Sequence, residues 1–141
     1  RNAHPPSVHS PPALHSFHQA AQLHPSYADA YCSAANIYNS LGNYPKAIES
    51  FQQAIKLRPA YTDAYMGLGN AYATSGNYPK ALESFQQAAQ LNPSYADAYC
   101  SMGNIFAAKG DGANVLKQIV KLRELNRRDL AGALEKTIEN R

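Results

Sequence analysis

The sequence has no tryptophan, only two cysteines among its 141 residues, and no long apolar run. A membrane-spanning helix needs about 18 or more consecutive apolar residues, and no stretch approaches that length. Two cysteines are too few to build a small disulfide-stapled domain. No charged-then-apolar start resembles a signal peptide, which favours an intracellular, cytoplasmic setting. These absences argue against a membrane-spanning or a disulfide-rich protein.

Charge is scarce and unevenly placed. Charged residues make up 16% of the chain and hydrophobic residues 45%, a balance typical of folded chains. Residues 1–112 carry six basic and six acidic residues, so the net charge of +3 arises entirely in residues 113–141. A groove for nucleic acid would need basic residues along its length, so we expect neither a nucleic-acid nor a membrane partner. The C-terminal basic residues are interpreted as a solvated helical face. They are Lys117, Lys121, Arg123, Arg127 and Arg128.

Residue patterns that carry catalysis or bind metals are also missing. All five histidines lie before residue 25. His15 and His18 are one helical turn apart, but they lack a cysteine or carboxylate partner and are interpreted as solvated. No Ser-His-Asp spacing, phosphate-binding loop or paired-carboxylate motif is present. The sequence therefore predicts no enzyme activity, no cofactor and no metal site.

What the sequence does contain is a repeat of 34 residues. Residues 28–61 and 62–95 are identical at 20 of 34 aligned positions. The segment NYPKA occurs at 43–47 and again at 77–81. Such self-similarity at a fixed period indicates an array of structural units that arose by duplication.

Each unit is expected to form two helices. In the first, from about Asp29 to Leu41, apolar residues recur at spacings of three, four and seven, which places them on one helical face. Gly69 and Gly103 on the equivalent faces lower helix propensity, so we expect a close backbone approach by the partner helix there. The first helices should end at glycines, where a left-handed residue is needed. These are Gly42, Gly76 and Gly110.

The second helix of each unit has its own start and stop signals. In the middle unit it should begin after Asn77, a good N-cap residue, and it carries Pro79 in its first turn, where a missing N–H is tolerated. Ser94 and Asp97 have the spacing of a capping box for the following helix, as have Ser26 and Asp29. The expected inward-facing residues are Ala47, Ile48, Phe51, Ala54 and Leu57, then Ala81, Leu82, Phe85, Ala88 and Leu91.

This pattern resembles the tetratricopeptide repeat. Aromatic, small, aromatic, alanine, phenylalanine, alanine and proline positions recur in that order: Tyr31/Tyr65/Tyr99, Ala35/Gly69/Gly103, Tyr38/Tyr72/Phe106, Ala47/Ala81, Phe51/Phe85, Ala54/Ala88 and Pro59/Pro93. The match covers roughly residues 13–126, and the segment YADAYCSMGNIF is also similar to repeats in the arrays of O-linked N-acetylglucosamine transferases. The resemblance implies an all-α fold, a right-handed α-solenoid of stacked antiparallel helix pairs.

The ends depart from the repeat. Residues 13–24 match 81–92 at nine of 12 positions and predict the second helix of an incomplete repeat, so we interpret the chain as a fragment or truncated array that begins in mid-repeat. A polar-backed helix at the C-terminus is typical of a cap. The predicted divisions are 1–12 (Pro/His/Ser-rich and irregular), 13–24, the repeats 28–61 and 62–95, a degenerate repeat 96–126, and a capping helix 129–141.

In this family the first helices line the concave side, which implies that their residues not used in stacking face a ligand. Asparagine both donates to and accepts from a peptide backbone, so three equivalent asparagines are interpreted as ligand contacts, with a hydrogen bond to a neighbouring helix as the structural alternative. Three equivalent aspartates are interpreted first as carboxylates at helix N-termini, which could also attract Lys or Arg on a ligand. The candidates are Asn36, Asn70, Asn104, Asp29, Asp63, Asp97, Cys32, Met66, Cys100 and Asn39; the two cysteines are interpreted as small, partly buried thiols.

These features favour a non-catalytic scaffold that binds a peptide in its concave groove. Tetratricopeptide domains that hold acidic chaperone C-termini use lysine and arginine beside such asparagines, whereas the sites here are Cys32, Ser33, Met66, Gly67 and Ser101, so we expect no acidic C-terminal ligand. Two alternatives stay open. The N-terminal helix could pair with a second copy in a homodimer, or the array could be the substrate-recognition arm of a larger enzyme. Acid-bearing first helices disfavour RNA binding.

Overall fold

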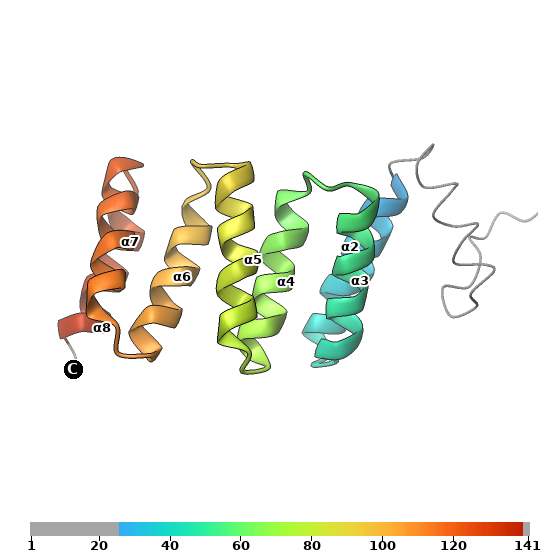
Figure 1. Cartoon of the computed structure of the whole chain (residues 1–141), viewed down its shortest axis with the longest axis horizontal. Coiled ribbons are helices and arrows are strands. Elements are labelled where there is room, and N and C mark those ends of the chain that lie inside the picture. The colour runs from blue at the N-terminus through green and yellow to red at the C-terminus, as the bar shows by residue number, and fades with distance from the viewer. Residues whose placement is uncertain (1–25, 140–141) are drawn as a thin grey trace, which may run out of the picture. The chain divides into compact units, whose positions relative to one another are not determined.

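The computed structural model describes residues 26–139, which contain seven helices and no strand. The chain divides into two compact units, with the boundary between Ala60 and Tyr61. The first unit holds α2 (Ser26–Ser40) and α3 (Tyr44–Leu57), which pack against each other. The second holds α4 (Thr62–Thr74), α5 (Tyr78–Leu91), α6 (Ala96–Ala108), α7 (Gly112–Glu124) and α8 (Arg128–Glu139) (Figure 1). The predicted all-α class is confirmed. The predictions for 1–12 and 13–24, and the homodimer through the latter, lie outside the described residues.

The turns between paired helices have the chemistry that the sequence predicted. Gly42, Gly76 and Gly110 have φ of +79°, +91° and +76°, the left-handed conformation that glycine adopts without steric cost. The next helix then begins after Asn43 or Asn77, whose Oδ1 accepts a hydrogen bond from the backbone N–H three residues on, at 3.4 Å in each case. The residues at the turn of each repeat therefore determine, by their own conformational preferences, how its two helices are connected.

The capping box predicted at Ser94 and Asp97 is wrong. The helix α6 begins at Ala96, and its N-cap residue is Tyr95, which makes no side-chain capping bond. Ser94 instead donates its hydroxyl hydrogen to Oδ1 of Asn92 at 2.9 Å. With Tyr95 as the N-cap residue, Ser94 lies one residue before the cap and Asp97 is the second residue of the helix, so the pair is out of register for a capping box.

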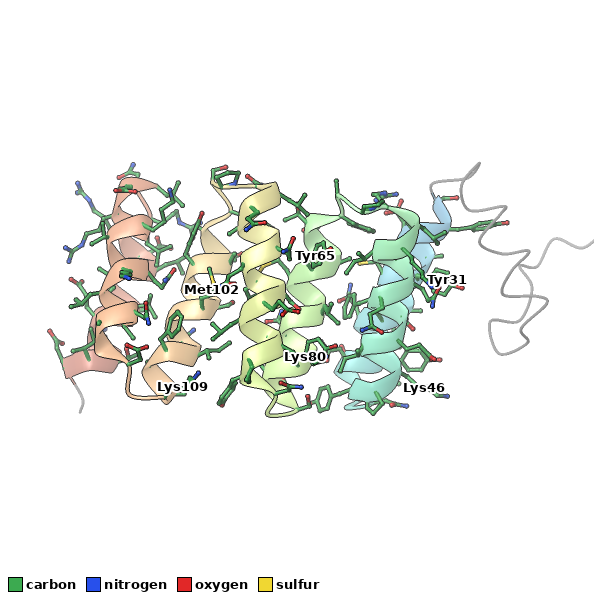
Figure 2. All side chains as sticks on the ribbon, in the orientation of Figure 1. Tyr31, Lys46, Tyr65, Lys80, Met102 and Lys109 are labelled. Atoms are coloured by element: carbon green, nitrogen blue, oxygen red, sulfur yellow. The ribbon has the colours of Figure 1, made fainter. Side chains whose placement is uncertain are left out.

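The predicted close approach at Gly69 exists, but a side chain and not a backbone fills it. A Cβ at Gly69 would lie 2.6 Å from Cε1 of Phe85, the ring that α5 inserts against α4. Phe85 is 1% exposed, so its ring has no room to withdraw. The core around it, to which Met102 of α6 also contributes (Figure 2), consists of Met66, Ala81, Phe85, Ala88, Ala98, Met102 and Ile105.

The degenerate repeat keeps the same packing by different means. Its second helix carries Ile119 at the position equivalent to Phe85, which leaves less volume to cover Gly103. Leu134 of α8 covers that glycine, because its Cδ1 fills the space that a Cβ on Gly103 would need. This last helix thus completes a second core made of Ala96, Ala107, Val115, Ile119, Leu122, Ala131 and Leu134.

Asp111 caps α7 and gives the fold a testable pH dependence. Its carboxylate accepts from the backbone N–H of Asn114 at 3.2 Å and from the Asn114 carboxamide at 2.6 Å. These two bonds, the side-chain bond first, hold the pKa of Asp111 below its usual value. A carboxyl group whose pKa is lower in the folded state stabilises that state above its unfolded pKa of about 3.9 and loses this contribution as the pH falls through the folded value.

We therefore expect Asp111→Ala to lower the free energy of unfolding at pH 7, and the difference from the native chain to shrink as the pH falls below about 4. Urea denaturation at a series of pH values measures it. Asp111→Asn is the control, because asparagine also caps but does not titrate. A native-to-alanine difference that stayed constant down to pH 2 would contradict the assignment.

Candidate functional site

A pocket of about 290 Å³ opens in the second unit between α4 and α6, over α5. Its lining brings together two of the three predicted asparagines, Asn70 from α4 and Asn104 from α6. The other lining residues are Ala73, Thr74, Tyr78, Phe85, Ser101, Ile105 and Ala108. Repeat stacking has thus placed equivalent residues of successive first helices on opposite sides of one hollow.

The pocket has an apolar floor and a polar rim. Phe85 and Ile105 are 1% and 4% exposed and belong to the core beneath. Asn70 and Asn104 are exposed, and neither carboxamide makes a hydrogen bond to another of the described residues. Within the described residues, the Asn70 and Asn104 carboxamides therefore do not make the hydrogen bond to a neighbouring helix that was the structural alternative.

The third predicted asparagine, Asn36, lies on α2 of the first unit. It is exposed, and its backbone carbonyl accepts from the hydroxyl of Ser40 at 3.0 Å. Its carboxamide, like the other two, has no hydrogen-bond partner within residues 26–139. All three asparagines therefore present their donors and acceptors to solvent.

The three aspartates lie in first helical turns, and two have protein partners. Asp29 on α2 accepts from Nη1 of Arg58 at 2.9 Å, and Asp63 on α4 accepts from the hydroxyl of Tyr95 at 3.2 Å. Burial, and then the negative charge of Asp63, raise the pKa of the Tyr95 phenol, so it remains a donor at neutral pH. Each of these two carboxylates links the start of the first helix of a repeat to a residue near the end of the same repeat. Their role is therefore structural.

Four further candidates differ in accessibility. Cys32 and Met66 are 6% and 8% exposed, and neither lines the pocket. Cys100 is half-buried; burial, then the charge of Asp97, raise the pKa of its thiol, which keeps it protonated and unreactive. Asn39 is half-buried, and its Oδ1 is buried without a hydrogen-bond partner among the described residues.

Among the pocket residues that the sequence analysis did not propose as ligand contacts are Tyr78, Phe85 and Ile105. Phe85 was assigned to the core only, and its periodicity gives no sign that one edge borders a hollow. Ile105 directly follows Asn104, so its side chain lies about 100° around the helix from a groove-facing one. This is a weak sequence signal that Ile105 borders the same groove.

Three ion pairs lie on α7, α8 and the turn between them. Arg123 pairs with Glu135, Arg127 with Asp129 at 3.0 Å, and Lys121 with Glu124 at 3.8 Å, while the Lys121 ammonium also lies over the ring of Tyr99. Within residues 26–139 no group of three or more histidine, cysteine or acidic side chains could hold a metal ion. None of the helices in the structure has the length and apolar character to cross a bilayer.

Comparison with known proteins gives matches of sequence and of fold. The TPR repeat family model matches residues 35–76 and 69–110. A crystal structure of MamA matches with 28% identity and a TM-score of 0.71 over 84% of this chain, which spans 67% of the MamA chain there and 62% of a second MamA structure. A comparison with curated proteins gives no significant match.

Two further solved structures share the fold at lower identity. The first TPR of Spaghetti (RPAP3), bound to the HSP90 peptide SRMEEVD, is 23% identical with a TM-score of 0.71, covering 80% of this chain and 91% of that one. The type III secretion translocator chaperone SycD of Yersinia enterocolitica is 18% identical with a TM-score of 0.73, covering 82% and 86%. The predicted α-solenoid class is thereby confirmed. Since the family models together span more than half of the sequence, this chain belongs to the tetratricopeptide repeat family.

Proposed function

We propose that this chain is a non-catalytic protein-interaction module whose repeats bind an extended peptide segment through the first helices. The observation that carries the proposal is the pair of exposed carboxamides, Asn70 and Asn104, on opposite sides of the pocket and without partners among the described residues. A carboxamide can donate to a peptide C=O and accept from a peptide N–H, so two in succession match the backbone of an extended chain.

Structural neighbours support a peptide ligand in general. The first and second TPR of Spaghetti (RPAP3) are each bound to the HSP90 peptide SRMEEVD. The chemistry differs here, because no lysine or arginine lines the pocket of the second unit. The ligand we propose for this chain is therefore a peptide other than an acidic C-terminal tail.

The aspartates are left out of the proposed peptide site. Asp29 and Asp63 already satisfy Arg58 and Tyr95, and a ligand cation would have to compete with those bonds. We propose that they fix the helix starts, while Asn70 and Asn104 contact a peptide on the second unit and Asn36 offers the equivalent carboxamide on the first.

Replacing Asn36, Asn70 and Asn104 together by alanine is expected to weaken peptide binding by about tenfold or more, since lost neutral hydrogen bonds contribute about 0.5–1.5 kcal/mol each. Alanine is the better helix former, so the melting temperature should not fall. Peptides selected on the full chain from a phage-displayed random library serve as ligands, with affinity measured by calorimetry and folding by circular dichroism.

The matched control is Gln86→Ala with Gln87→Ala, which removes two exposed carboxamides of α5 that do not line the pocket. This control should bind as the native chain does. Unchanged affinity in the asparagine variant would make those side chains structural only and would overturn the proposal.

A further inference from the structure

The pocket beside the asparagines carries no charge of either sign. None of its nine lining residues is acidic, basic or histidine. A charged side chain that entered it would lose water over the buried Phe85 and Ile105 without meeting a counter-charge, which is costly. Neither of the adjacent repeat lysines lines the pocket: the Lys80 ammonium lies 5.9 Å from the ring centre of Tyr72, and Lys109 is the C-cap residue of α6.

The two carboxamides of the rim match the donors and acceptors of a peptide backbone. The hydroxyl of Thr74 donates to the backbone carbonyl of Asn70 at 2.8 Å, so its hydrogen is already used. Asn70 and Asn104 retain both donors and acceptors. A peptide residue that placed its backbone between these carboxamides would direct its side chain toward the apolar floor.

The size of the pocket limits what that side chain can be. A volume of about 290 Å³ lies just below the roughly 300–1,000 Å³ found for small-molecule sites, so it suits a side chain better than a whole cofactor. Two alanines, Ala73 at the end of α4 and Ala108 at the end of α6, keep it open. A larger residue at either position would occupy the space itself.

We infer that the bound peptide inserts one uncharged aliphatic side chain, of the size of valine, leucine or isoleucine, between Asn70 and Asn104 onto Phe85 and Ile105. Ala73 and Ala108 set the size limit. This inference rests on the proposed peptide-binding function and adds to it the chemistry of one ligand position.

The test uses a library-selected peptide, acetylated and amidated at its ends, in which each position is changed in turn to alanine, glutamate and lysine. One aliphatic position should lose about tenfold or more in affinity with any of the three changes, since alanine removes buried methylenes and glutamate or lysine would bring an unpaired charge onto an apolar surface. Calorimetry with the full chain measures each affinity.

Pocket-filling variants then locate that position. Ala108→Leu, on an exposed site, should weaken the native peptide about tenfold and make its aliphatic-to-alanine change nearly silent, because the pocket is already occupied. Thr74→Leu, also exposed, provides a second such variant at the rim, and Ala133→Leu on α8 is the control outside the pocket. Circular dichroism verifies that each variant is folded.

The outcomes separate this inference from the proposed function. If charged residues are tolerated at every position, or if both pocket-filling variants bind normally while the asparagine variant does not, the pocket inference is overturned and peptide binding stands. If the library yields no binding peptide, the proposed function fails and the inference fails with it.

Discussion

Replacing Phe85 by alanine is expected to lower the free energy of unfolding by about 3–5 kcal/mol, the usual cost of removing a buried ring. The ring is 1% exposed and joins α4, α5 and α6 in one core. Its removal leaves a cavity that cannot collapse easily, because Ala81 and Ala88 on the same face of α5 are too small to fill it. Urea denaturation monitored by circular dichroism measures the loss.

Two comparisons sharpen this prediction. Phe51→Ala, which removes the equivalent, fully buried ring of the first unit, should be similarly costly. Gln86→Ala, next to Phe85 on the exposed side of α5, should change stability by no more than about 0.5 kcal/mol. A Phe85→Ala loss as small as that of Gln86→Ala would show that the helices do not pack around this ring.

The effect of Gly69→Ala on the free energy of unfolding is expected to change sign when Phe85 is replaced by alanine. In the native chain, the new Cβ of Gly69→Ala would stand 2.6–2.8 Å from three ring atoms of Phe85, and overpacking of this kind costs about 1–3 kcal/mol. In a Phe85→Ala background the ring is gone, and alanine should gain the helix propensity of up to about 1 kcal/mol that glycine lacks.

The measurement is a double-mutant cycle with Gly69→Ala, Phe85→Ala and the combination of both. The account predicts a coupling free energy of at least about 1 kcal/mol, since the two positions are in direct contact. Equal effects of Gly69→Ala in both backgrounds would show that a Cβ at position 69 does not clash with the Phe85 ring, and would contradict this explanation of the glycine.

Much of the fold could be predicted because its signals are local and repeated. Gly76, Asn77 and Pro79 define a turn and a helix start by their own conformational preferences, whatever packs around them. The capping box predicted at Ser94 failed because α6 begins one residue later than the spacing requires, with Tyr95 as the N-cap residue, and a spacing rule does not fix the first residue of a helix.

The rest depends on contacts between helices that no local pattern encodes. That Leu134 covers Gly103 follows from the smaller Ile119, which takes the place of a phenylalanine, and from how α8 packs on α6. The asparagines were identified from their helical register, but the hollow between two of them, with the buried Phe85 and Ile105 beneath it, arises only from stacking.

The assignment of the asparagines as peptide contacts is tested most directly by the side-chain NH₂ resonances of Asn70 and Asn104 in a ¹⁵N NMR titration of the full chain with a library-selected peptide. The account predicts that both pairs of signals shift together along the binding curve, while those of Gln86 and Gln87 on the exposed face of α5 stay in place. Saturable binding that left both asparagine signals unmoved would place the peptide elsewhere and contradict the account.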